Sequence, residues 1–290
     1  MQSFAQKDYR AEGGLRLVAD IAGPAGAPLV VLLHGGGQTR HSWAGAMGLL
    51  VGAGYRVISF DARGHGDSDW SPEGHYDLPS RARDLQVILA EEDRAASDRP
   101  TALVGASMGG MTSFYGVGKG LLHSIRGLVL VDIVLRPAEA GVRKIQSFMQ
   151  GHTDGFATLE AAADAVAAYN PQRPRPRDIS GLMKNLRRRD DGRLHWHWDT
   201  RMLEPSTNPD TPDWSDQLIA VSHGVTVPTL LIRGDQSDIV DDQGVSELKR
   251  LVPQTQVLDV AGAGHMVAGD RNDAFNAGVL AFLAEHMPAR

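Results

Sequence analysis

The sequence of 290 residues contains no cysteine. This absence excludes disulfide bonds, zinc–thiolate sites, iron–sulfur clusters and a cysteine nucleophile. Long hydrophobic runs are absent too, because stretches such as 29–33 are far shorter than the ~18 residues of a membrane-spanning helix. Residues 1–14 also lack the apolar segment of a secretory signal. We therefore expect a cytoplasmic protein with no membrane partner.

An excess of positive charge is also absent. The chain has 29 Lys and Arg against 35 Asp and Glu, which gives a formal net charge of −6. We therefore expect no nucleic-acid partner, since a chain-wide basic field is missing. The hydrophobic fraction of 42% and the charged fraction of 22% are typical of a soluble globular protein. Glycine is abundant, with 33 residues, and its clusters mark the informative positions.

Short, uninterrupted apolar runs alternate with helical patterns along much of the chain. Such runs are typical of strands that are covered on both faces. The expected strands are 15–21, 29–34, 55–60, 101–106, 125–132, 227–233 and 255–260. The expected helices are 42–52, 78–92, 108–119, 243–251 and 272–286. This alternation predicts an α/β fold with a doubly wound, mostly parallel sheet and right-handed crossovers.

The alternation stops between about residues 135 and 214. This segment holds an alanine-rich helix over 159–169, a stretch rich in Pro and Arg, and the sequence LHWHWD at 194–199. We interpret residues 135–214 as a mainly helical cap inserted between two strands of one sheet. Residues 1–134 and 215–290 would then form the core.

A G-x-S-x-G motif occupies residues 105–109, where an expected strand ends and an expected helix begins. Such a turn is sharp and strained, so the residues two positions either side of the serine must be small. The turn would raise the hydroxyl of Ser107 above the sheet at the N-terminus of the helix, where N–H groups favour developing negative charge. Ser107 is therefore the candidate nucleophile.

A serine hydroxyl needs a general base that is oriented by a third group. His265 lies between glycines after the last expected strand, at the same edge of the sheet as Ser107, and is the candidate base. For the acid we favour Asp238. It lies three residues beyond Asp235, far enough from the strand end for the chain to curve toward the histidine. Asp235, in the same loop, and Asp132, at the end of the preceding core strand, remain alternatives.

The sequence His34-Gly35-Gly36-Gly37 follows the first long apolar run. Glycines at this point allow a main-chain N–H to face a substrate oxygen without a Cβ in the way. We expect the N–H groups of Gly36 and Met108 to form the oxyanion hole, and His34 to be structural.

These motifs together resemble the α/β-hydrolase superfamily. The order Ser107, Asp238, His265 matches the serine–acid–histidine order of that family, and Asp-Ala-Arg-Gly-His-Gly-Asp-Ser at 61–68 resembles its D-x-R-G-x-G-x-S turn. The resemblance implies an eight-stranded sheet with a cap after the sixth strand. A serine at the elbow argues against haloalkane dehalogenases and most epoxide hydrolases of the family, which use aspartate there.

The resemblance implies a serine hydrolase that cleaves a carboxylic ester of a small or medium acyl substrate through an acyl-enzyme. Ester hydrolysis demands least beyond the triad, and no cofactor or metal is required. The alternatives are a C–C bond hydrolase, a lactonase or a perhydrolase on the same triad. A ligand-binding protein on a hydrolase scaffold is an alternative of another class. The sequence leaves the natural substrate and the oligomeric state open.

The cap contains two features that could bear on substrate selection. Aromatic residues Phe148, Trp196 and Trp198 are candidates for the substrate pocket, although they could equally form the core of the cap. From Arg173 to Arg193 there are eight Lys or Arg residues against three Asp. This basic run could attract an anionic substrate, but we favour a solvated face with ion pairs.

Overall fold

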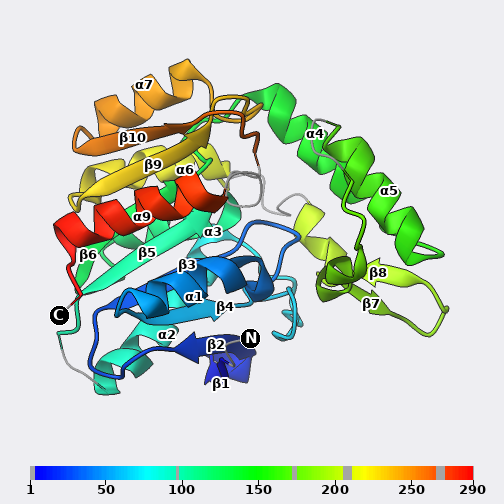
Figure 1. Ribbon diagram of the computed structural model, residues 1–290, viewed down its shortest axis with the longest axis horizontal. Helices are drawn as coiled ribbons and strands as arrows, with labels where there is room; N and C mark the ends of the chain where they lie inside the picture. Colours follow the sequence, from blue (N-terminus) through cyan, green and yellow to red (C-terminus); the bar gives the residue numbers. More distant parts are fainter. Residues whose placement is uncertain (1–3, 96–97, 172–174, 205–210, 266–271, 290) are drawn as a thin grey trace.

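A computed structural model of the chain describes residues 4–95, 98–171, 175–204, 211–265 and 272–289. Eight strands form one sheet in the order β1-β2-β4-β3-β5-β6-β9-β10 (Figure 1). Their bounds are β1 (Ala5–Arg10), β2 (Arg16–Ala22), β3 (Leu29–Leu33), β4 (Arg56–Phe60), β5 (Thr101–Ala106), β6 (Ile125–Val131), β9 (Thr229–Gly234) and β10 (Thr255–Val260). Strands β3–β6, β9 and β10 run parallel, while β2 is antiparallel to both β1 and β4. The predicted eight-stranded, mostly parallel sheet is confirmed.

Helices cover both faces of the sheet. The hydrophobic side chains on one face pack with helices α1 (Ala44–Gly52) and α9 (Asn272–His286), and those on the other face pack with α2 (Leu78–Ala95), α3 (Met108–Gly118), α6 (Trp214–Val221) and α7 (Asp242–Leu251). Strand β3 shows why its run is uninterrupted, because Leu29, Val31 and Leu33 enter one cluster while Val30 and Leu32 enter the other. Among the described residues, no helix is long and apolar enough to cross a membrane.

The elements from α4 (Glu139–Gln150) to η4 (Thr200–Leu203), which lie between β6 and α6 in the chain, are placed to one side of the carboxyl ends of the strands (Figure 1). The elements between these two are α5 (Leu159–Tyr169), η3 (Ser180–Asn185), β7 (Leu186–Arg188) and β8 (Leu194–Trp196). The sequence LHWHWD, for which no strand was expected, supplies β8, which pairs antiparallel with β7. Phe156, Ala162, Leu186 and Leu194 form the small core of this cap.

Strand β1 was not predicted from the sequence. Its burial pattern explains the omission, since Tyr9 is its only fully buried side chain and the strand lies at the edge of the sheet. Three short 3₁₀ turns complete the described structure: η1 (Glu12–Gly14), η2 (Arg40–Trp43) and η5 (Ser222–Gly224).

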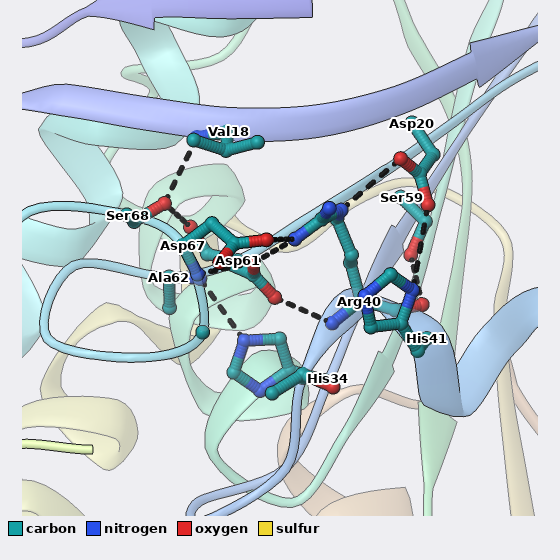
Figure 2. A network of polar contacts seen from close by, with 12 residues as sticks. Val18, Asp20, His34, Arg40, His41, Ser59, Asp61, Ala62, Asp67 and Ser68 are labelled. Atoms are coloured by element: carbon teal, nitrogen blue, oxygen red, sulfur yellow. Dashed lines mark hydrogen bonds and ion pairs between the residues drawn. The ribbon is translucent and has the colours of Figure 1, made fainter. Parts of the chain in front are cut away.

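The turn after β4 is built around the buried carboxylate of Asp61 (Figure 2). The main-chain N–H of Arg40 donates to Asp61 Oδ1 at 2.6 Å, and the guanidinium of Arg40 pairs with the same carboxylate. Asp67 N–H donates to Asp61 Oδ2 at 2.9 Å, and Ser68 Oγ donates to the carbonyl of Asp61 at 2.6 Å. At Gly66, with φ +52°, a Cβ would lie 2.2 Å from Asp61 Cγ, so a side chain has no room. The network therefore holds the turn against Arg40, close to the predicted oxyanion loop.

Two buried histidines, His34 and His65, join this turn to the glycine-rich loop after β3. His34 Nδ1 donates to the carbonyl of Gly35 at 2.8 Å, and its Nε2 accepts from Ala62 N–H at 3.0 Å. His65 Nε2 accepts from Gly37 N–H at 3.2 Å. An accepting ring nitrogen requires the neutral imidazole. Burial lowers the pKa of both rings, which keeps them neutral.

The first prediction concerns the buried carboxylate. Asp61→Ala should lower the free energy of unfolding by about 3–5 kcal/mol, because it removes one of the three carboxylates that pair with the buried guanidinium of Arg40 and leaves two main-chain N–H groups without their acceptor. Urea unfolding followed by circular dichroism measures the change. The control is Asp8→Ala, which removes an exposed partner of Arg16 and should cost less than about 1 kcal/mol. Equal losses in the two variants would contradict the central role of Asp61.

The second prediction concerns pH. Burial lowers the folded-state pKa of His34 and His65, and burial followed by the charge of Arg187 lowers that of His197 to about 4. The unfolded chain then binds more protons than the folded chain below about pH 6.5. The free energy of unfolding should therefore be constant above about pH 7 and fall as the pH decreases from 6.5 toward 4. Urea titrations across this range test it, and a constant or rising value would refute it. His65→Gln should make the fall shallower.

Candidate active site

Ser107 occupies the turn between β5 and α3 with φ +45° and ψ −113°, a conformation that side-chain-bearing residues rarely adopt. The predicted need for small neighbours is confirmed by the spacing around it. A Cβ on Gly105 would lie 2.5 Å from the carbonyl carbon of Gly109, and a Cβ on Gly109 would lie 2.4 Å from the carbonyl oxygen of Leu33. At Gly110 it would lie 2.6 Å from the side chain of Ile133. The three glycines thus let the helix start directly against the sheet.

His265 follows β10, and its imidazole lines the same cavity as Ser107. Its Nδ1 lies 2.8 Å from Oδ2 of Asp132. The side chain of Asp132 is 1% exposed and that of His265 is 15% exposed, so the pair is shielded while the ring still reaches the cavity. A buried carboxylate on Nδ1 sets the tautomer with Nε2 free to accept a proton.

The structure corrects the assignment of the acid. Asp238 does not reach His265: its carboxylate is 38% exposed and accepts from Lys144 Nζ of α4 at 2.7 Å. Asp235 accepts from Gly262 N–H at 2.8 Å and so ties the two loops together. The carboxylate beside the histidine belongs to Asp132, which the sequence analysis had kept only as an alternative.

Local geometry explains why Asp132 takes this place. It follows β6 directly with φ +48°, so the chain turns sharply at the strand end. Its Oδ1 accepts from Gly234 N–H at 3.1 Å, and its Oδ2 accepts from Ser237 Oγ at 2.6 Å. A Cβ on Gly234 would lie 2.1 Å from the carbonyl oxygen of Ala263, so glycine allows the two loops to approach. The loop after β9 therefore surrounds the Asp132 carboxylate instead of supplying the acid.

Ser237 is a residue that the sequence analysis missed. Its hydroxyl donates to Asp132 and accepts from the N–H groups of Ile239 and Val240 at 3.2 and 3.1 Å. These bonds fix both the loop and the carboxylate. A single serine in a polar loop carries no sequence signal for this role, because the role depends on β6 and β9 being neighbours in the sheet.

The loop after β3 presents one free main-chain donor to the cavity. The N–H of Gly35 donates to Gln38 Oε1 at 3.1 Å, and that of Gly37 is taken by a buried histidine. Within the described part of the chain, the N–H of Gly36 has no acceptor. Met108 is the first residue of α3, where N–H groups have no partner within the helix. Gly36 and Met108, the predicted oxyanion pair, both line the cavity.

The cavity has a volume of about 490 Å³, which suits a small or medium-sized ligand. The three aromatic residues expected at the pocket, Phe148, Trp196 and Trp198, all line it. Further lining residues, which sequence reasoning did not find, are Ile145, Met149, Val166, Tyr169, Asn170, Leu182 and Asn185. The amphipathic pattern of α4 could have predicted Ile145 and Met149. A helix of the cap with one apolar face must pack that face either against the rest of the protein or along the cavity.

Comparisons with known proteins identify the family of the chain. A family model described as alpha/beta hydrolase fold matches residues 28–271. An esterase of Mycobacterium tuberculosis is 32% identical over 252 residues, which cover 84% of this chain and 79% of that protein. A sn-1-specific diacylglycerol lipase of Mus musculus is 29% identical over 277 residues, which cover 90% of this chain and 83% of the lipase.

Solved structures show the same likeness. The crystal structure of the Mycobacterium tuberculosis esterase matches with a TM-score of 0.74 and 26% identity, covering 98% of this chain and 93% of that chain. An E-2-(acetamidomethylene)succinate hydrolase matches in fold with a TM-score of 0.80 and 21% identity, covering 97% and 99% of the two chains. The predicted superfamily is confirmed: the chain belongs to the α/β-hydrolase fold family.

Proposed function

We propose that the protein hydrolyses carboxylic esters through an acyl-enzyme on Ser107. The observation that carries the proposal is the buried Asp132–His265 pair, whose imidazole lines one cavity together with Ser107 and the N–H groups of Gly36 and Met108. Two relatives support it, since one is named an esterase and the other a diacylglycerol lipase. A complete triad beside an oxyanion hole also favours an enzyme over a ligand-binding protein on the same scaffold.

In the acylation step, His265 Nε2 takes the proton of Ser107 Oγ while that oxygen attacks the ester carbonyl carbon. The carbonyl oxygen becomes an oxyanion that accepts hydrogen bonds from Gly36 N–H and Met108 N–H. Asp132 stabilises the imidazolium through Nδ1. The imidazolium then protonates the leaving alkoxide as the C–O bond breaks, which releases the alcohol and leaves the acyl group on Ser107.

Deacylation repeats these steps with water as the nucleophile. His265 Nε2 accepts a proton from the water as its oxygen attacks the acyl carbon, and the same two N–H groups stabilise the second oxyanion. Ser107 Oγ leaves and takes the proton back from His265. The products are the carboxylic acid and the free enzyme, and no cofactor or metal takes part in either step.

The third prediction tests the nucleophile. Ser107→Ala should abolish covalent labelling by a fluorophosphonate probe and lower kcat on p-nitrophenyl butyrate by ~10⁴–10⁶, because the attacking oxygen is removed. Labelling is read by mass spectrometry of the intact protein. Ser42→Ala, a cavity serine outside the triad, is the control and should keep its label. Undiminished turnover by Ser107→Ala would overturn the proposed function.

The fourth prediction tests the corrected acid. Asp132→Asn keeps the size of the side chain but places an N–H where His265 Nδ1 needs an acceptor, so kcat should fall by about 10⁴ with little change in KM. Asp238→Asn breaks only the partly exposed contact with Lys144 and should stay within about tenfold of the parent. Steady-state kinetics on one ester compares the variants, after circular dichroism has shown both to be folded. A crippled Asp238→Asn beside an active Asp132→Asn would return the assignment to Asp238.

A further inference from the structure

The described residues that line the cavity include no Asp, Glu, Lys or Arg. The only titratable side chains among them are His265 and Tyr169, and burial raises the pKa of Tyr169 to about 12, so its phenol stays neutral. The polar groups are neutral side chains: Gln38, Ser42, Asn170 and Asn185. A ligand in this cavity therefore meets hydrogen-bonding groups and apolar surface, but no fixed ionic partner from the described chain.

The wall that the cap contributes is the most apolar part of this lining. Phe148 stacks on Tyr169 with ring centroids 4.5 Å apart, and the ring of Trp196 lies 6.0 Å from Phe148. The remaining apolar side chains of the cap wall are Ile145, Met149, Val166, Leu182 and Trp198. Strongly packed aromatic rings beside flexible methionine and leucine side chains form a surface suited to a hydrocarbon group.

Most of the described cations of the cap have partners outside the cavity, although Lys144 also lies over the ring of Tyr169, 5.1 Å from its centroid. Lys144 pairs with Asp238, and Arg187 pairs with Asp67 at 2.5 Å. Arg175 pairs with Asp164 at 3.0 Å. Within the basic run, Arg193 donates to main-chain carbonyls, Arg188 donates to the carbonyl of Gly192, and Arg189 lies over the exposed ring of Trp70. Lys184 is exposed, and Arg173 lies outside the described residues. The described basic side chains of this run thus bind separate surface partners or are exposed, and none lines the cavity.

A carboxylate that enters such a cavity loses its hydration without gaining a cationic partner from the described lining. The effective cost of this transfer is large, and it is repaid only where a counter-charge and several hydrogen bonds are provided. An uncharged acyl chain of the same size gains by the same transfer, because it removes apolar surface from water. The described lining, which contributes no charged side chain, therefore favours an uncharged acyl group over an anionic one.

We infer that the substrate is an ester whose acyl group is uncharged and largely apolar, held against the cap wall of Phe148, Tyr169 and Trp196. The inference rests on the proposed ester hydrolysis and specifies its substrate class. It rejects dicarboxylate half-esters and ring-cleavage acids, which the basic run of the cap could have suggested as substrates.

Two esters that differ in one charge give the sharpest test. Mono-p-nitrophenyl glutarate carries a carboxylate at the end of its acyl chain, and its methyl ester has nearly the same size without the charge. Release of p-nitrophenolate reports the same bond in both, and rates in alkaline buffer without enzyme correct for intrinsic reactivity. We expect kcat/KM for the neutral ester to exceed that for the anionic ester by at least about 100-fold. A ratio near one, or a preference for the anion, would overturn the inference.

Matched variants locate the discrimination in the cavity. Leu182 and Met183 are neighbours in η3, but Leu182 lines the cavity whereas Met183 is 43% exposed. Leu182→Arg should reduce the preference for the neutral ester at least about tenfold by supplying a counter-charge, and Met183→Arg should leave it unchanged. The pair Met149→Arg and Gln150→Arg repeats the comparison on α4, so the test survives if Leu182→Arg fails to fold.

The outcomes separate the inference from the function on which it rests. Failure of the parent to hydrolyse either ester, together with absent fluorophosphonate labelling, would remove the proposed function itself. Hydrolysis of both esters at equal rates would retain the esterase and remove only the neutral-substrate inference. A fall in anionic-ester turnover on Lys184→Gln or Arg188→Gln would assign anion recognition to the basic run and would also overturn it.

Discussion

The carboxylate of Asp132 is the group on which the arrangement of the site depends. It is buried at the edge of the sheet, where an unpaired charge would be costly. Its hydrogen bonds come from three directions: Gly234 N–H, Ser237 Oγ and His265 Nδ1. One ionised side chain therefore binds together the loops that follow β6, β9 and β10. Because His265 Nδ1 is one of these three partners, the hydrogen bonding of the buried carboxylate also fixes the position of His265.

Backbone strain accompanies that arrangement. Ser107 and Asp132 end neighbouring parallel strands, and each has a positive φ that a side chain normally disfavours. Such conformations persist only where the surrounding structure imposes them. Here the glycines of the elbow allow α3 to approach the sheet closely. The turn around Asp61 and the buried His34 and His65 hold the glycine-rich loop after β3 on the side of Ser107 away from Asp132. Packing against the core thus positions the candidate catalytic groups, while side chains of the cap line the cavity beside them.

The parts of this structure that could be predicted from the sequence are those with a strict local requirement. Uninterrupted apolar runs predict the core strands because both faces of each strand are covered. The glycines around Ser107 and before His265 mark positions where two main-chain segments come close together. Both residues could therefore be named as candidates from the sequence.

The acid was assigned wrongly because its identity depends on the order of strands in space. Reach along the chain favoured Asp238, but β6 lies next to β9, and the small size of Gly234 lets Asp132 act across the end of β9. The Asp238 side chain instead pairs with the cap helix α4. Strands β7 and β8 escaped prediction for a related reason. With three residues each, they are too short to show a period, and their pairing is set by the cap around them.

The most direct measurement of the Asp132–His265 interaction is proton NMR of the imidazole Nδ1–H. A proton held between an imidazole nitrogen and a buried carboxylate is strongly deshielded and resonates far downfield of the amide region. At low pH the parent protein should show such a resonance from His265, separate from any signal of the His195–Asp191 pair. The resonance should persist in Asp238→Asn and disappear in both His265→Gln and Asp132→Asn. A resonance that survives in Asp132→Asn but is lost in Asp238→Asn would contradict the pairing on which this site is built.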